Sequence, residues 1–199
     1  MSNEITVKVN CSLEEMYKTL ENKGFSVVDK FNLEDVYYIP KEIDIKNQPI
    51  RKILSKYILI RNIIQFVPDR FINSYNILKI TLKRKNIAQD GTIIEQYNKD
   101  CQIKDKIEAK ELIEELGYKE IMTIKEKSIV YGKNDLKLAI KDIEDGENLI
   151  EVETVEDNPK LDTTEKLKVI INELQIPIDT NDYFVKKAEN ELNKILLGE

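Results

Sequence analysis

The sequence predicts an α+β fold, in which antiparallel strands form a sheet and helices cover one of its faces. Three observations lead to this prediction. Several segments alternate apolar and polar residues with the two-residue period of a strand that is buried on one side. Amphipathic segments begin at capping residues and end before glycine, as helices commonly do. The dipeptide Asp90-Gly91 separates two strand segments and is typical of a tight antiparallel hairpin.

The composition is that of a globular chain with many charges. Charged residues make up 34% and hydrophobic residues 41% of the 199 positions, which fits a single domain over residues 1–199. No apolar stretch is long enough for a transmembrane helix, and a strand pattern that begins at Glu4 leaves no room for a signal peptide. Cys11 and Cys101 lack the spacing of a zinc site or disulfide framework. We therefore expect a cytoplasmic protein.

One missing residue type narrows the possible chemistry. The chain contains no histidine, which excludes serine–histidine triads, histidine bases and imidazole metal sites. Catalysis would have to use carboxylates, lysine, tyrosine or metal ions. The net charge of -6 disfavours nonspecific binding to nucleic acid, although local basic clusters could still bind phosphate groups.

Two similar helices are predicted from their ends. The first covers residues 12–23, where Ser12 can accept a backbone hydrogen bond in the first turn while Glu15 reaches back, and Gly24 ends it. The second covers residues 105–116 and also stops before a glycine. Each helix is followed by an aromatic residue and a strand-like segment.

The remaining elements follow from the same patterns. Further strands are predicted over residues 4–9, 57–62, 75–85, 92–102, 136–142 and 149–155. A third helix is predicted over residues 43–56, with a break near Pro49 because proline cannot donate to the helical ladder. Two more helices, over residues 164–174 and 182–197, are expected to pack on the sheet.

Charged residues collect on one side of the predicted strands. In the first strand Glu4, Thr6 and Lys8 share one side, and Glu151 and Glu153 do the same in the last. An ordinary sheet with one solvent-exposed face explains this pattern most simply. Alternatively, the strands close into a barrel, which removes exposed edges and gathers both signs of charge inside. A polyanion with divalent cations would satisfy such a lumen.

A set of motifs in this order resembles the CYTH superfamily, the triphosphate tunnel metalloenzymes that include class IV adenylyl cyclases, thiamine triphosphatases and inorganic triphosphatases. The matching residues are Glu4-Ile5-Thr6-Val7-Lys8, Asp35-Val36-Tyr37-Tyr38-Ile39-Pro40, Arg61, Thr81, Lys83, Glu95, Lys125-Glu126-Lys127, Tyr131, Asp142 and Glu151-Val152-Glu153. The likeness spans nearly the whole chain. It implies a closed eight-stranded antiparallel β-barrel, a tunnel with a charged lumen surrounded by helices.

The resemblance also implies roles for particular residues. Metal ligands for Mg²⁺ or Mn²⁺ would be Glu4, Glu151 and Glu153. Substrate-binding cations would be Lys8, Arg61, Lys83, Lys125 and Lys127. Glu95 and Lys8 would serve the reaction itself, Glu95 with a second ion that positions or deprotonates water and Lys8 by neutralising phosphate oxygens.

Several departures from the family pattern keep alternatives open. Thr6 stands in place of a carboxylate, Leu59 in place of an arginine, and Ile93 and Tyr97 in place of a basic and an acidic residue. The leading hypothesis is metal-dependent hydrolysis of inorganic tripolyphosphate or an organic triphosphate. The alternatives are a class IV-type adenylyl cyclase, a noncatalytic triphosphate-binding module and a protein-interaction domain. We expect a small-molecule partner, no nucleic acid or membrane, and a monomer or homodimer.

Overall fold

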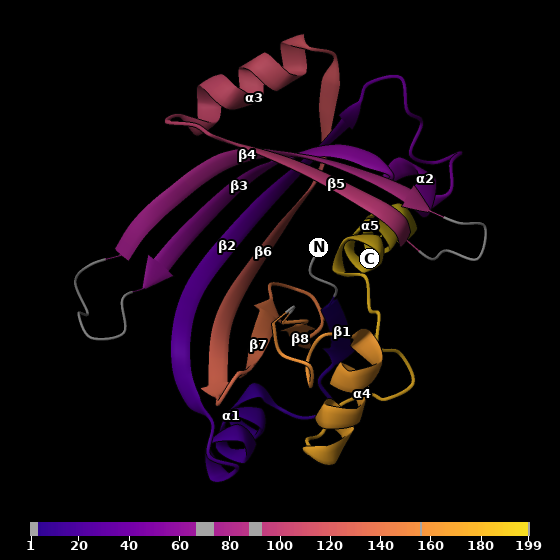
Figure 1. Cartoon of the computed structure of the whole chain (residues 1–199). Coiled ribbons are helices and arrows are strands. Elements are labelled where there is room, and N and C mark those ends of the chain that lie inside the picture. The colour runs from indigo at the N-terminus through magenta and orange to yellow at the C-terminus, as the bar shows by residue number, and fades with distance from the viewer. Residues whose placement is uncertain (1–3, 67–73, 88–92, 156, 199) are drawn as a thin grey trace. The chain divides into compact units, whose positions relative to one another are not determined.

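The computed structural model describes residues 4–66, 74–87, 93–155 and 157–198, without the side chains of residues 86–87 and 93–96. The predicted Asp90-Gly91 turn lies outside the described residues. The strands are β1 (Glu4–Lys8), β2 (Ser26–Pro40), β3 (Lys56–Phe66), β4 (Ser74–Ile87), β5 (Ile93–Gln102), β6 (Tyr118–Lys133), β7 (Leu136–Ile143) and β8 (Leu149–Glu153) (Figure 1). The helices are α1 (Leu13–Asn22), α2 (Ile50–Ile53), α3 (Lys106–Glu115), α4 (Thr164–Glu173) and α5 (Lys187–Leu197).

The predicted helix ends are largely confirmed. The Ser12 side chain accepts from the Glu15 backbone N–H and caps α1, which gives way to Gly24 at a φ of 82°. Asp105 caps α3 in the same way. The helix predicted over residues 43–56 shrinks to the single turn of α2, because Pro49 fixes its start and residues 41–49 form turns instead.

The eight strands belong to one sheet in the order β1-β8-β7-β6-β2-β3-β4-β5. The prediction of a closed barrel is wrong, because within the described residues β1 and β5 are the edges of an open sheet. The outer edge of β1 is occupied by residues 177–185. The Thr6 N–H donates to the Tyr183 carbonyl at 3.0 Å, and the Val185 N–H donates to the Thr6 carbonyl at 3.0 Å. This segment satisfies backbone groups that closure of the barrel would require.

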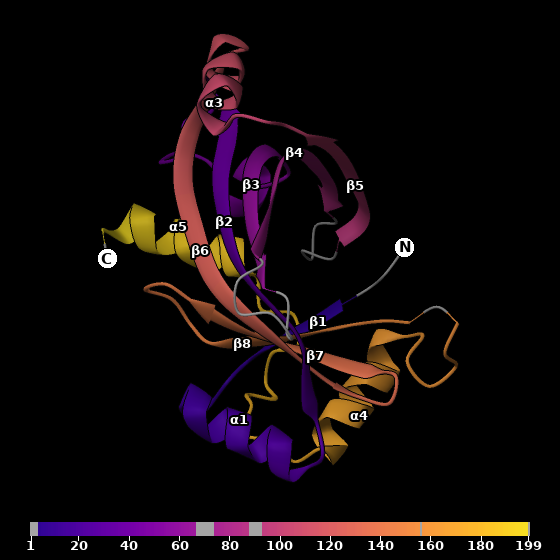
Figure 2. The same ribbon diagram turned by 90° about the vertical axis from the view of Figure 1, so that its left-hand side faces the viewer.

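The chain forms two compact units. The first comprises residues 1–32, 66–74 and 126–186, and the second comprises residues 33–65, 75–125 and 187–199. In the first unit α1 and α4 lie on the same side of β1, β7 and β8 (Figures 1 and 2). Its core includes Ile5, Leu20, Ile140, Ile150 and Leu167, all nearly or fully buried. Burial of these apolar side chains fixes which face of β1 and β8 points away from the helices.

In the second unit α3 lies across the ends of β2 and β6 (Figure 2). Ala109 and Ile113 of α3 pack with Val36, Tyr38 and Ile60. Not every apolar residue of the predicted 105–116 helix is buried, because Ile107, Leu112 and Leu116 are 57–69% exposed. No helix among the described residues is long and apolar enough to cross a membrane.

Candidate active site

A charged face is built by β1, β8, β7 and β6 of the first unit. The strand register pairs Glu4 with Glu153 and Thr6 with Glu151, so these side chains share one side of the sheet. Glu151 also pairs with Ala139, which places Lys141, two residues further along β7, on that same side. The other side carries the core residues that pack against α1 and α4. The charged side chains therefore point away from the core, because apolar and polar residues alternate along these strands.

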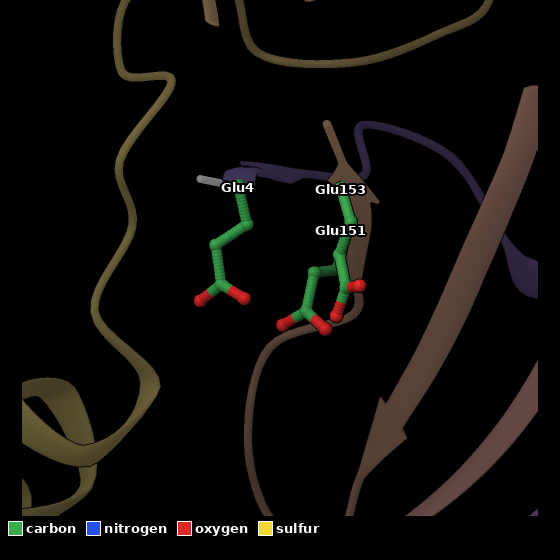
Figure 3. A group of neighbouring side chains, drawn as sticks. All are labelled: Glu4, Glu151 and Glu153. Carbon is green, nitrogen blue, oxygen red and sulfur yellow. The ribbon is translucent and has the colours of Figure 1, made fainter. Parts of the chain in front are cut away.

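Three carboxylates converge on this face. One ligand oxygen from each of Glu4, Glu151 and Glu153 lies within 4.8 Å of the others. Figure 3 shows the three side chains extending to the same side of β1 and β8. Glu4 and Glu153 are exposed and Glu151 is half-buried. Neighbouring carboxylates repel one another unless a cation lies among them, and all-oxygen donors suit hard ions such as Mg²⁺ or Mn²⁺. The donor set therefore fits a divalent metal.

A lysine links this carboxylate group to a buried glutamate. Lys141 Nζ lies 2.5 Å from Glu151 Oε2 and 3.9 Å from Glu126 Oε1. Ser128 Oγ donates to Glu126 Oε1 at 3.1 Å. Lys141, Glu126 and Ser128 were not among the predicted site residues. Lys137 and Lys141 alternate with apolar Leu138 and Ile140, a signal that could have found Lys141.

Lys8 lies on the charged face but is engaged by a carboxylate. Its ammonium group pairs with Glu147, in the turn between β7 and β8. The hydrogen bond and the charge of Glu147 raise the pKa of Lys8 above its ordinary value, against the effect of burial, and the charge of Asp179 adds to the rise. A phosphate that binds Lys8 would have to compete with Glu147.

The structure places Lys127 on the opposite side of the sheet. Lys127 pairs with Asp142 of β7, one residue from Lys141, so the two lysines point to different faces. Along β6 the exposed Lys125 and Lys127 alternate with the buried Glu126. Lys127 of the Lys125-Glu126-Lys127 motif therefore does not share a face with Glu4, Glu151 and Glu153, whereas the central Glu126 reaches Lys141 on their face.

Arg61 of the second unit forms a bidentate ion pair. Its Nε donates to Asp35 Oδ1 at 2.7 Å, and its Nη2 donates to Asp35 Oδ2 at 2.6 Å. The Asp35 side chain is 0% exposed, and that of Arg61 is 23% exposed. Two aligned donors are what a buried carboxylate needs in place of water. The Arg61 guanidinium, which was predicted to bind substrate, is thus directed at Asp35.

A second charged row runs along β4. Thr81, 3% exposed, pairs across the sheet with Asp100, and Lys79 Nζ lies 2.5 Å from Asp100 Oδ2. Burial opposes ionisation of Asp100, but the hydrogen bond and charge of Lys79 with the charge of Arg61 lower its pKa below the ordinary value. Lys83 lies on the same side of β4 as Lys79.

Glu95 can be placed only by its backbone. It pairs with Asn86 across the β4–β5 ladder, and its side chain lies outside the described residues. Its predicted role with water therefore stays a prediction.

The comparisons with known proteins support the fold. No protein-family model matches the sequence, and no curated protein matches it. A solved structure from Pyrococcus horikoshii is similar, with 20% identity, a TM-score of 0.68 and coverage of 98% of this chain and 99% of that chain. A proposed adenylate cyclase from Vibrio parahaemolyticus has 13% identity and a TM-score of 0.61, over 100% of this chain and 98% of that chain.

A third solved structure carries a stated activity. A proposed adenylyl cyclase from Hippeastrum, described as having a dominant triphosphatase activity, has 14% identity and a TM-score of 0.57, over 98% of this chain and 96% of that chain. These likenesses extend over almost the full length of each protein. The chain therefore shares the fold of these solved structures, two of which are described as proposed adenylyl cyclases, and the predicted resemblance is confirmed for the fold alone.

Proposed function

We propose that the protein binds a triphosphate together with Mg²⁺ or Mn²⁺ on the charged face of the first unit and hydrolyses it. The observation that carries this proposal is the convergence of Glu4, Glu151 and Glu153, within 4.8 Å, on the face that also bears Lys8 and Lys141. Carboxylates for a metal beside ammonium groups for phosphate are the two components that triphosphate chemistry requires. The triphosphatase activity described for the Hippeastrum protein supports the same substrate class.

In this proposal each residue has a positional or electrostatic task. Glu4, Glu151 and Glu153 would hold the metal, which would neutralise phosphate charge and lower the pKa of the attacking water. Lys141 fixes the orientation of Glu151 through its 2.5 Å contact. Lys8 exchanges Glu147 for a phosphate oxygen as substrate enters. Water adds to the terminal phosphorus, and the bond between that phosphorus and the bridging oxygen breaks. The terminal group leaves as inorganic phosphate, the remaining diphosphate keeps the bridging oxygen, and a proton is released near neutral pH.

Phosphate release tests the proposal directly. The purified protein would be assayed with Mg²⁺ or Mn²⁺ on tripolyphosphate, thiamine triphosphate and ATP, before and after the Glu153→Gln substitution. We expect metal-dependent release in the wild type and a loss of at least about 10- to 100-fold in the variant, because losing a mere hydrogen-bond partner of a metal ligand already costs that much. Glu173→Gln, an exposed site on α4, serves as the control and should retain activity. Background rates with every substrate and metal would overturn hydrolysis.

A noncatalytic triphosphate-binding module is the second candidate. It is favoured by how many cations already have carboxylate partners, since Lys8 pairs with Glu147 and Arg61 with Asp35. Calorimetry would then detect tripolyphosphate binding without any product.

An adenylyl cyclase is the third candidate, favoured by the descriptions of the Vibrio and Hippeastrum proteins. The ATP assay identifies it through cyclic AMP in place of released phosphate. We further propose that the protein acts in the cytoplasm, in keeping with its two free cysteines, Cys11 and Cys101.

A further inference from the structure

We propose that Lys141 is a built-in cation that limits the carboxylate group of the first unit to a single divalent ion. The inference rests on the proposed function, because it concerns the metal held by Glu4, Glu151 and Glu153. It goes beyond the proposed function by assigning Lys141 a role in setting how many metal ions bind and where the bound ion lies.

The contacts place the Lys141 ammonium between two carboxylates. Its Nζ is 2.5 Å from Glu151 and 3.9 Å from Glu126, and its side chain is only 13% exposed. Glu151 is shared, because it also belongs to the group formed with Glu4 and Glu153. One end of this carboxylate row is thus occupied by the lysine, and the other end is open to solvent through the exposed Glu4 and Glu153.

Burial explains why the lysine is needed at that end. The Glu126 side chain is 1% exposed and receives a hydrogen bond from Ser128. A buried carboxylate is strongly destabilising unless it is paired, and the Lys141 ammonium lies 3.9 Å from this one. An ion between Glu126 and Glu151 would have to occupy the space of the ammonium group, so the lysine and a second metal exclude each other.

The net charge of the four glutamates and Lys141 also favours a single divalent ion. Four carboxylates and one ammonium leave three net negative charges, and one divalent ion reduces this to one. A second divalent ion would make the group positive before any substrate arrives. Without Lys141, the four carboxylates would carry four negative charges, which two divalent ions neutralise. Removal of the lysine should therefore open a second site rather than merely weaken the first.

The test counts bound Mn²⁺ in the absence of substrate. Calorimetry and the loss of the free-ion paramagnetic resonance signal would give the stoichiometry for the wild type, Lys141→Met and Lys137→Met. Lys137 is the matched control, because it lies on the same side of β7 but is exposed. We expect one ion for the wild type and for Lys137→Met, and two ions for Lys141→Met. The double variant Glu126→Gln/Lys141→Met removes the extra carboxylate and should return to one.

The outcomes separate this inference from the proposed function. One ion in both the wild type and a folded Lys141→Met overturns the built-in cation and leaves the proposed metal site standing. Two ions in the wild type also overturn it, whether or not the variant folds. No binding to the wild type overturns both proposals. Circular dichroism establishes that each variant is folded before ions are counted.

Discussion

The Arg61–Asp35 ion pair predicts a large loss of stability when its buried partner is neutralised. Asp35→Asn keeps the shape of the side chain, but it removes the charge and turns an amide N–H₂ toward the Arg61 donors. Breaking a buried ion pair by removing one partner costs about 3–5 kcal/mol. Because the Arg61 side chain keeps 23% exposure, water can solvate part of its charge. We therefore expect the lower end, a decrease of about 3 kcal/mol in the free energy of unfolding.

Urea unfolding followed by circular dichroism measures this loss. The matched control is Asp100→Asn, which breaks the Lys79–Asp100 pair of the same unit, where the Asp100 side chain is 46% exposed. Exposed pairs contribute about 0–1 kcal/mol, so the control should change stability little. A decrease below about 1 kcal/mol for Asp35→Asn, or one equal to the control, would refute the reasoning that burial decides the strength of these pairs.

Two further predictions concern the first unit. A Cβ at Gly132 would lie 2.8 Å from Val28 Cγ1, so Gly132→Ala should lower the free energy of unfolding by about 1–3 kcal/mol. Val28→Ala in that background should restore most of the loss, and no recovery would contradict the proposed clash. Burial, with the charge and hydrogen bond of Glu21, raises the pKa of Tyr131 from 10.0 to about 12. Because the folded state holds this proton more tightly, its stabilisation is complete below pH 10 and is lost as the pH rises toward about 12. Spectroscopic titration at high pH should show late tyrosinate signals, and Tyr131→Phe should reduce their amplitude by one tyrosine, whereas an unchanged titration would contradict the shift.

The sequence predicted local structure better than long-range pairing. The caps at Ser12 and Asp105 are decided within one helical turn, so the starts of α1 and α3 could be read directly. Closure of the barrel would have required the free edge of β1 to pair with another strand of the sheet. Residues 177–185 occupy that edge through backbone hydrogen bonds, and their sequence has no regular alternation that would have indicated it.

In the candidate site too, local patterns could be predicted from the sequence and the pairing of distant strands could not. Alternation correctly put Glu4 on the side opposite Ile5, and the β1–β8 register then brought Glu151 and Glu153 to it. For β6, alternation could say that Lys125 and Lys127 share a side but not which side faces the carboxylates. The answer lies in the pairing of β6 with β7, which turns Glu126 toward Lys141 across a separation of 15 positions in the sequence.

Calorimetric titration with tripolyphosphate, in the presence and absence of Mg²⁺, tests the central claim most directly. The wild type would be compared with a variant in which both Glu151 and Glu153 are changed to glutamine. Binding that requires Mg²⁺ and disappears in the double variant is the result the charged face predicts. Binding that is equally strong without Mg²⁺ and in the variant, or no binding by the wild type, would contradict it.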